Sequence, residues 1–422
     1  MTTLDQNSDF ARSHPTILLV GTSYRHSPIS FRETLVRALS GNEGKTLLEN
    51  LPGAEETALL STCNRTELYA VSNDPERTTR AFRSRIQQLL NNLDESHFFV
   101  LEGSAAIEHL FRVSSGLDSI VLGEPQILSQ VRDAGIAARL EGSAKGVLSP
   151  LFDRAFRVGR RLRTSFRFGS GEASLSSLAI SVAKQRLKKT RPNVLLIGTG
   201  KMVQLAAKEL QKMKAQLYIA SKRDGVPAIL GYAKKVRYDR VPKVASRSDL
   251  IISATNSAGY VLTKNDLKGS GRKLIVDLGM PRNIDPAIRG TKNVELLDLD
   301  DLARKKSPRT PRSQRLLKAE SQISKEVEEF ERWLIETRFS DGLAKLYGWA
   351  HHVRDEEVQR AAKKLHLSSN RETKVLDSLG RRVVSKLLSK PTIFVRNRNS
   401  AMTEVERLRI LQAVFDLGED GK

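Results

Sequence analysis

The middle of the chain reads Val194-Leu-Leu-Ile-Gly198-Thr-Gly200-Lys-Met-Val203, and this stretch decides its fold. Four apolar residues predict a buried strand, and the two glycines after them allow a tight turn into a helix. In such a turn the backbone approaches a pyrophosphate closely, and the N–H groups that begin the helix bind its charge. The third glycine of the usual fingerprint is replaced by Val203, so we expect the helix to lie farther from the sheet.

Strand-like runs alternate with helical or loop segments after this turn, and a helix over residues 174–187 leads into it. The alternation is typical of a parallel, doubly wound, Rossmann-like sheet. The predicted strands are residues 194–197, 216–220, 235–238, 250–253, 274–277 and 294–297.

The end of the second predicted strand indicates which dinucleotide binds. An NAD-binding site places an acidic residue here for the ribose hydroxyls, but this chain has Ser221, Lys222 and Arg223. A hydroxyl and two cations fit a 2′-phosphate, so the sequence predicts NADPH rather than NADH. The expected cofactor-binding residues are Gly198, Thr199, Gly200, Lys201, Met202, Val203, Ser221, Lys222 and Arg223.

The first part of the chain mixes short strands with helices and predicts an α+β domain. We expect strands over residues 16–21, 57–62 and 66–71. We expect helices over residues 30–39, 75–90, 104–113, 126–140 and 148–163.

The last part predicts helices only. After Pro308 and Pro311, apolar residues at helical spacing predict one helix over residues 313–365. A helix of this length must pack its apolar stripe on another helix or on a second copy of the chain, so we expect a homodimer. The stripe includes Leu317, Ile323, Val327, Phe330, Leu334 and Ile335.

These differences in predicted secondary structure divide the chain into three domains. We expect a catalytic domain over residues 1–168, a cofactor domain over 169–306 and a helical dimerisation domain over 307–422, joined by the long helix. Glycines at 169 and 171 suggest a hinge at the first boundary.

The charge predicts a polyanionic partner. The formal net charge is +22, from 70 Lys and Arg against 48 Asp and Glu, and clustered cations gain free energy by releasing counterions from phosphates. Solvated helix faces explain any single cluster equally well. The clusters are Arg154, Arg157, Arg160, Arg161, Arg163 and Arg167; Lys184, Arg186, Lys188, Lys189 and Arg191; and Arg304, Lys305, Lys306, Arg309, Arg312 and Arg315.

Composition excludes several other classes of protein. The apolar runs are far shorter than the roughly 20 residues of a membrane-spanning helix, and residues 1–15 lack the apolar centre of a signal peptide. A single cysteine, Cys63, excludes an intramolecular disulfide, and the seven scattered histidines show no metal-ligand spacing. We therefore expect a cytoplasmic protein without a metal.

Cys63 lies between two predicted strands. A lone cysteine is more often a small apolar core residue than a nucleophile. Its neighbours are polar, however, and a nearby Arg65 would favour the thiolate. A thiolate attacks an activated ester and leaves a thioester, which hydride reduces to an aldehyde.

Two long segments resemble the signatures of the glutamyl-tRNA reductase family. They are Ser61-Thr-Cys-Asn-Arg-Thr-Glu67 and Gly116-Leu-Asp-Ser-Ile-Val-Leu-Gly-Glu-Pro-Gln-Ile-Leu-Ser-Gln-Val131. The opening Gly21-Thr-Ser-Tyr-Arg-His26, the glycine turn, Asp277-Leu-Gly-Met-Pro281-Arg282 and the long helix follow in the family's order. The resemblance covers nearly the whole chain. Departures are Thr199, where the family often has alanine, and Ser389, where it often has histidine.

The resemblance implies the reaction. Cys63 would attack the ester of glutamyl-tRNA(Glu), and NADPH would reduce the thioester to glutamate-1-semialdehyde, the entry to 5-aminolevulinate and tetrapyrroles such as haem. Catalytic roles would fall to Cys63 and His109, with Arg65 gripping the substrate carboxylate and Glu124 its α-ammonium. An aminotransferase could take over the aldehyde. The implied substrate-binding residues are Thr62, Asn64, Arg65, Ser119, Glu124, Pro125, Gln126 and Gln130.

Two alternatives stay open at this point. A tRNA-independent NADP-dependent oxidoreductase of the shikimate-dehydrogenase type would explain the middle domain but not the basic clusters or the surroundings of Cys63. A nucleic-acid-binding regulator with a dinucleotide fold would require a helix-turn-helix or stacking aromatics, and aromatic residues make up only 5% of the chain.

Overall fold

The computed structural model describes residues 15–39, 50–90, 94–166, 175–187, 189–222, 227, 230–255, 257, 259–267, 269, 271–305, 314–365, 370–396, 402, 407, 410–411 and 413–415. The chain forms two compact units, Met1–Val327 and Glu328–Lys422. Both expected domain boundaries, at 168/169 and 306/307, lie outside the described residues, as does the expected hinge. The three-domain division stays a prediction.

An antiparallel sheet of four strands forms the start of the first unit, in the order β2-β3-β1-β4. The strands are β1 (Thr16–Ser23), β2 (Ala54–Ser61), β3 (Arg65–Ser72) and β4 (Phe99–Glu102). The first three confirm the predicted strands. β4 was not predicted, because four residues at a sheet edge carry too little periodicity to be recognised.

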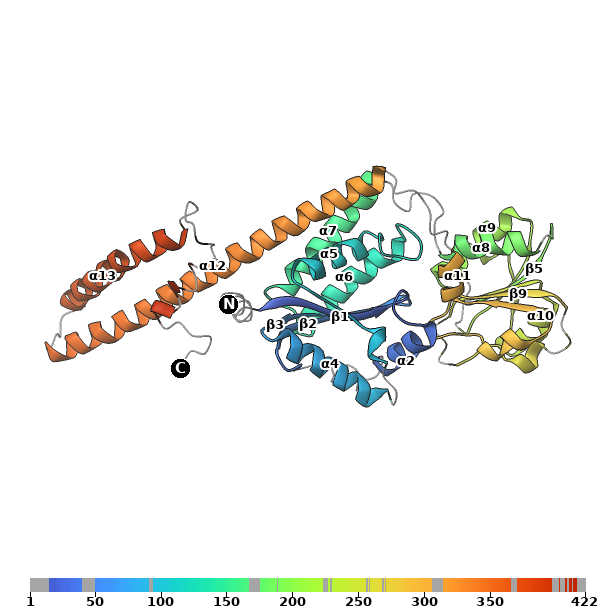
Figure 1. The fold of residues 1–422 in the computed structure, drawn as a ribbon, viewed down its shortest axis with the longest axis horizontal. Coiled ribbons are helices and arrows are strands. Elements are labelled where there is room, and N and C mark those ends of the chain that lie inside the picture. The colour runs from blue at the N-terminus through green and yellow to red at the C-terminus, as the bar shows by residue number, and fades with distance from the viewer. Residues whose placement is uncertain are drawn as a thin grey trace, which may run out of the picture. The chain divides into compact units, whose positions relative to one another are not determined.

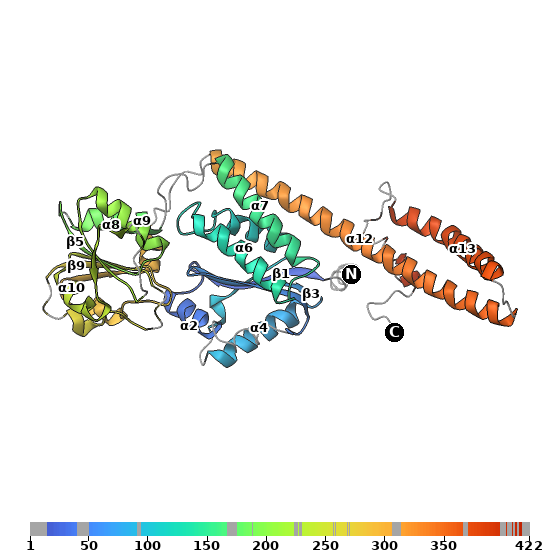
Figure 2. The same cartoon turned by 180° about the vertical axis from the view of Figure 1, so that it is seen from behind.

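Helices cover both faces of this sheet, so its central strands β1 and β3 are buried along almost their whole length. In Figures 1 and 2, α5 (Ser104–Ser114), α6 (Pro125–Leu140) and α7 (Leu148–Phe166) lie on one face and α4 (Pro75–Leu89) on the other. Leu18, Leu68 and Phe82 belong to the apolar core on the α4 side, which also receives α2 (Ile29–Leu39). All five helices confirm the predicted ones.

Six parallel strands form the second sheet of the first unit, in the order β10-β9-β8-β5-β6-β7. The order runs outward in both directions from β5 and β8, which makes the gap between their carboxyl ends the switch point where dinucleotides bind. The strands are β5 (Asn193–Ile197), β6 (Gln216–Ala220), β7 (Lys234–Val236), β8 (Leu250–Ser253), β9 (Lys273–Asp277) and β10 (Val294–Leu297). They confirm the predicted doubly wound fold.

Both faces of this sheet are covered as well. One apolar cluster joins the sheet to α8 (Leu175–Leu187), α9 (Lys201–Lys212) and α11 (Leu299–Lys305). Another lies beneath α10 (Val241–Arg247). Val203, on α9, is fully buried in the first cluster. The expectation that it keeps the helix farther from the sheet stays a prediction.

The long helix α12 (Gln314–Lys364) confirms the predicted one and crosses the boundary between the units. Within the first unit, Glu326 forms ion pairs with Arg154 and Arg161 of α7. In the second unit, α12 packs on α13 (Asn370–Arg396) through a cluster that includes Leu346 and Leu388. Among the described residues, no helix is long and apolar enough to cross a membrane.

Candidate active site

Cys63 lies in the bend between β2 and β3, with a partly accessible side chain. The bend is closed by a hydrogen bond from the Thr62 N–H to the Arg65 carbonyl oxygen at 2.8 Å. The Thr62 hydroxyl oxygen accepts from the N–H groups of Asn64 and Arg65, each at 3.2 Å. Thr62 therefore fixes the backbone on both sides of the sulfur.

Alternation along β3 brings charged residues to the face that α5 covers. Arg65, Glu67 and Tyr69 are two residues apart and share one side of the sheet. Opposite Glu67 stands Gly21 on β1, where an added Cβ would lie 2.8 Å from Glu67 Cγ. The glycine thus leaves room for a carboxylate inside the domain.

Glu67 is fully buried and is the centre of a polar network. Its carboxylate accepts from Arg65 Nη1 at 2.7 Å, from His109 Nε2 at 2.9 Å and from the Tyr69 hydroxyl at 2.9 Å. Burial opposes its ionisation, but Arg65 and His109 outweigh burial and lower the pKa of Glu67 to about 2. Glu67 is therefore a permanent anion.

His109 owes its orientation to Glu67. Because an ionised carboxylate only accepts, the hydrogen of the imidazole lies on Nε2, and Nδ1 is left as the basic nitrogen. The ring also lies 5.4 Å from the Phe99 ring, centre to centre. A histidine held in one tautomer by a buried acid is the arrangement that proton transfer requires.

Arg65 already has partners on both terminal nitrogens. Nη2 donates to the Asp118 carbonyl oxygen at 2.5 Å and to its carboxylate at 3.0 Å, while Nη1 donates to Glu67. Burial would lower the pKa of Arg65, but Glu67 and Asp118 raise it instead. The expected grip on a substrate carboxylate stays a prediction, and it requires the partly exposed Asp118 to give way.

Glu124 differs from Glu67 in lacking a cation. It precedes α6, which begins at Pro125, and its carbonyl oxygen accepts from Arg163 Nη1 at 2.7 Å. Among the described residues none forms a hydrogen bond or ion pair with its carboxylate. Burial raises the pKa of Glu124 to about 7, against the opposing charges of Arg65 and Arg163.

The Cys63 thiol is protonated at neutral pH in this arrangement. Burial, and then the negative charge of Glu124, raise its pKa to about 12, although Arg32 and Arg65 oppose the rise. The expectation that Arg65 favours the thiolate is correct in direction, but burial outweighs it. A substrate group that neutralises Glu124 would remove one cause of the high pKa.

The remaining expected substrate residues lie in the loop before α6 and at the start of that helix. Ser119 is buried in this loop, and its neighbours Ile120 and Val121 belong to the same apolar cluster as Cys63. Gln126 and Gln130 lie on the first two turns of α6 and are partly exposed. The structure thus brings both signature segments to the surroundings of Cys63.

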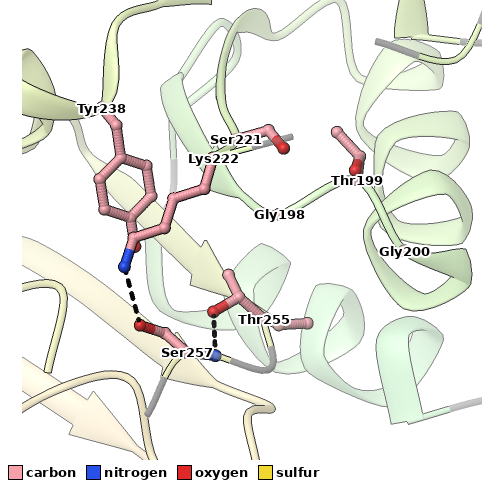
Figure 3. A pocket seen from close by; sticks show the side chains of 9 residues that line it. Gly198, Thr199, Gly200, Ser221, Lys222, Tyr238, Thr255 and Ser257 are labelled. Carbon is pink, nitrogen blue, oxygen red and sulfur yellow. Dashed lines mark hydrogen bonds between the residues drawn. The ribbon is translucent and has the colours of Figure 1, made fainter. Parts of the chain in front are cut away.

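A second site, a cleft at the carboxyl ends of β5, β6 and β8, contains the glycine turn (Figure 3). Gly198 has φ +112°, and an added Cβ would lie 2.4 Å from the Ala254 carbonyl oxygen, so only glycine fits. Nothing would lie within 4 Å of a Cβ on Gly200, the residue before α9, and the helix has no side-chain cap there. Open space beside uncapped N–H groups fits a pyrophosphate.

Two of the three residues expected at the 2′-phosphate, Ser221 and Lys222, line the same cleft. Lys222 Nζ lies 3.5 Å from the Ser257 hydroxyl oxygen and 5.0 Å from the centre of the Tyr238 ring (Figure 3). Ser221 and Thr199 line the cleft, whereas Lys201 is exposed on α9 and Met202 packs partly into the core. Arg223 lies outside the described residues.

Sequence reasoning missed several residues of both sites. Glu67 carried a signal, since it stands two residues after Arg65 on a predicted strand. Asp118 lies inside the second signature segment, but its contact with Arg65 joins distant parts of the chain. Tyr238, Thr255 and Ser257 carried no signal, because they reach the cleft from separate segments.

The basic cluster on α7 contains both paired and unpaired cations. Arg154 and Arg161 pair with Glu326, and Arg163 binds the Glu124 carbonyl. Arg157 and Arg160 are exposed, and among the described residues they have no ion-pair partner. These two cations are free to meet a phosphate.

Three family models match consecutive parts of the chain. They are the N-terminal domain of glutamyl-tRNAGlu reductase over residues 20–166, shikimate / quinate 5-dehydrogenase over 181–305 and the dimerisation domain of glutamyl-tRNAGlu reductase over 318–417. Because reductase domains flank the dehydrogenase-like one, the shikimate-dehydrogenase alternative is not favoured.

Individual relatives match over nearly their full length. The glutamyl-tRNA reductase of Sulfurihydrogenibium sp. (strain YO3AOP1) is 31% identical over 94% of each chain. That of Pelotomaculum thermopropionicum is 32% identical over 96% of this chain and 95% of the relative. The solved glutamyl-tRNA reductase from Methanopyrus kandleri is 26% identical, covers 95% of this chain and 99% of its own, and has a TM-score of 0.50.

Proposed function

We propose that this chain, which belongs to the glutamyl-tRNA reductase family, reduces glutamyl-tRNA(Glu) to glutamate-1-semialdehyde with NADPH and releases the tRNA. This is the committed step towards 5-aminolevulinate and tetrapyrroles. The observation that carries the proposal is Cys63, the single cysteine, which stands in a braced bend and packs against the apolar core of the cofactor-binding sheet.

Cys63 performs the first half of the reaction. Its sulfur attacks the ester carbonyl carbon, the bond to the terminal ribose oxygen breaks, and that oxygen leaves on the tRNA with a proton. We assign that proton to His109 Nδ1, because Glu67 occupies Nε2. Glutamate stays on Cys63 as a thioester.

Substrate charge prepares Cys63 for attack. The α-ammonium group of glutamate is the natural partner for the unpaired carboxylate of Glu124. Once that charge is neutralised, less negative potential acts on Cys63, and its pKa falls from the value of about 12 that burial and Glu124 impose. The other proposed substrate-binding residues are Thr62, Asn64, Ser119, Pro125, Gln126 and Gln130.

The chain's fold supplies the place for a nicotinamide dinucleotide, which when bound delivers the hydride. The aldehyde forms as the hydride adds to the thioester carbon and the carbon–sulfur bond breaks, returning the thiolate to Cys63. We propose NADPH specifically because Lys222 stands where an NAD site has an acid. No described residue that lines the cleft is acidic.

A homodimer and a charged tRNA(Glu) are the proposed partners. The second unit matches a dimerisation domain, and α13 exposes a row of apolar side chains, Val375, Leu379, Val383 and Leu387, that suits a second copy. Sedimentation at micromolar concentration should give twice the 47.0 kDa of one chain, and a monomer mass would contradict the dimer.

We also propose the division into three domains, with limits at 168/169 and 306/307. The gaps between the matched family models support these limits.

Delivery of the product to an aminotransferase completes the proposal. An amino aldehyde is reactive in water, so direct transfer would protect it. A cytoplasmic location suits both enzymes and the free thiol of Cys63.

A single-turnover assay with glutamate-charged tRNA tests the function. Wild type should release the tRNA without NADPH and keep a trappable glutamyl adduct on Cys63, and it should form aldehyde only with NADPH. Cys63→Ser should do neither. Turnover that survives Cys63→Ser would support the tRNA-independent dehydrogenase instead.

A further inference from the structure

Two adjacent charged residues of α2, a helix that packs on the first sheet, are buried. The side chains of Arg32 and Glu33 are 1% and 6% exposed. Buried charges persist only when they are paired. Both find their partners beyond the first sheet, on segments that follow β9 and β10.

Asp300 is the partner of the start of α2. Its carboxylate accepts from the Ile29 N–H at 2.7 Å and from Arg32 Nη2 at 2.7 Å. The first turn of α2 contains no acidic residue of its own, so Asp300 provides the negative charge that a helix N-terminus favours. The N-terminus of α2 therefore has a carboxylate to accept its first N–H group only when Asp300 is in contact with it.

Glu33 is the partner of Arg282. Its carboxylate accepts from the Arg282 backbone N–H and from Arg282 Nε, both at 2.8 Å. Arg37 of α2 donates to the same carboxylate at 3.0 Å. A carboxylate that binds one residue through both its main chain and its side chain fixes the position of that residue.

The turn that carries Arg282 continues into the wall of the cofactor cleft. Asp277 accepts from the N–H groups of Asn283 at 2.8 Å and Ile284 at 2.9 Å, which makes the turn rigid. The Asn283 side-chain oxygen in turn accepts from the Thr255 N–H at 2.8 Å. Thr255 lines the cleft, so one turn joins Glu33 to the cofactor site.

Apolar contacts join the same two parts beside the nucleophile. Ile29 and Ile120 are buried in the cluster that contains Leu278 and Leu299 of the cofactor side, and Cys63 packs against that cluster. A hydride can move only between groups in contact, so the relative position of cleft and sulfur decides the second half of the reaction.

We propose that Asp300 and Glu33 are positioning residues, which hold the cofactor cleft against Cys63 for the hydride step and are not needed for release of the tRNA. The role rests on the proposed function, because it divides the two halves of that reaction. It assigns a task to Arg32 and Arg282 as well, as the cations that the two carboxylates bind.

The test compares the full-length wild type with the double variant Glu33→Gln, Asp300→Asn. The first readout needs neither cofactor nor tRNA: the rate at which an uncharged maleimide alkylates Cys63, the single thiol in the chain. The second is the rate of tRNA release without NADPH, and the third is aldehyde formation at saturating NADPH. Equilibrium binding of NADPH shows whether the cleft itself is intact.

Loss of the two contacts should make alkylation roughly tenfold faster and aldehyde formation roughly tenfold slower, since charge-assisted hydrogen bonds are the strong ones. Release of tRNA and binding of NADPH should change less than about twofold. Glu209→Gln is the matched control: it removes a 2.5 Å ion pair to Lys212 within the cofactor region and should change none of the four.

Three results separate the possible failures. Unchanged alkylation and unchanged aldehyde formation would overturn the positioning role. An equal fall in tRNA release and aldehyde formation would also overturn it, because the variant would then have damaged the surroundings of Cys63 themselves. A wild type that never releases tRNA would disprove the proposed function. The alkylation comparison would still show whether Glu33 and Asp300 hold the cofactor cleft against Cys63.

A milder variant guards against misfolding of the double variant. Arg282→Met keeps Glu33 and Asp300 and removes one side-chain donor. It should shift alkylation and aldehyde formation in the same directions by a smaller factor, and no shift would count against the role. Glu33 is not among the groups that set the pKa of Cys63, so its single variant Glu33→Gln separates loss of contact from a change in thiol ionisation.

Discussion

The surroundings of Cys63 and the cleft at the glycine turn are built on opposite plans. Around Cys63, charged side chains from distant segments bind one another, as Arg65 does with Asp118 at 3.0 Å. In the cleft, backbone and small side chains leave an open space, and Lys222 is exposed at its edge. The first plan holds reacting groups still, and the second leaves room for a large ligand.

The two buried glutamates show what a partner does inside the first plan. Glu67 and Glu124 are both at most 6% exposed. Arg65 and His109 lower the pKa of Glu67 to about 2 in spite of burial, whereas burial raises the pKa of Glu124 to about 7. A direct cationic partner makes the difference: Arg65 and His109 keep Glu67 ionised, and Glu124 has no such partner among the described residues.

Removing the charge of Glu67 should have the largest effect. Glu67→Gln leaves the buried guanidinium of Arg65 with one acid instead of two and breaks the hold on His109. Loss of one partner of a buried ion pair costs about 3–5 kcal/mol of unfolding free energy. Chemical denaturation followed by circular dichroism measures this loss.

Glu95→Gln is the matched control for Glu67→Gln. Glu95 pairs with Arg83 at 3.0 Å, but its side chain is 64% exposed. A pair of this kind contributes about 0–1 kcal/mol, so the control should unfold almost as wild type does. Equal losses of unfolding free energy for the two variants would show that the buried network of Glu67 stabilises the fold no more than an exposed ion pair does.

Glu124→Gln should have the second largest effect on the free energy of unfolding, and this effect should depend on pH. The folded pKa of about 7 lies above the reference value of 4.5, so the folded state holds this proton more tightly than the unfolded state does. The contribution to stability is full below pH 4.5 and is lost as the pH rises to about 7.

The measurement is the difference in unfolding free energy between Glu124→Gln and wild type at pH 4.5 and at pH 8. Relative to wild type, the variant should gain up to about 3 kcal/mol over this range, since one pKa unit corresponds to about 1.4 kcal/mol. Asp277, whose pKa burial also raises to about 7, titrates in both proteins and cancels from the difference. A difference independent of pH would mean that Glu124 is ionised throughout and already has a partner.

The same contrast explains which features could be predicted from sequence. Gly198 and Gly200 act through local backbone geometry, so their turn and the strands around it could be recognised from a few adjacent residues. The bend at Cys63 was recognised in the same way. The Glu67 network could not be, because it joins β3 to His109 and Asp118, about 40 to 50 residues away.

The helical part shows a further limit. The periodicity of α12 is long enough to predict, but α13 contains Pro391 inside the helix, which ordinarily argues against one. The packing of Leu388 and Val395 in the cluster with α12 supports the helix around this proline. Tertiary contacts of this kind are absent from local sequence.

Lys222→Ala should have the smallest effect, and it tests the open plan of the cleft. The ammonium group lies against Tyr238 and near Ser257, with no described carboxylate lining the cleft to compete for it, so a 2′-phosphate can bind it directly. Its loss should weaken NADPH binding about tenfold, which corresponds to about 1.4 kcal/mol, and leave NADH binding nearly unchanged. Fluorescence titration with both cofactors measures the ratio.

Lys201→Ala, on the exposed start of α9, is the control that should weaken both cofactors alike, since a helix N-terminus binds the pyrophosphate that they share. Equal weakening by Lys222→Ala would place Lys222 at the pyrophosphate too and remove the structural reason for preferring NADPH.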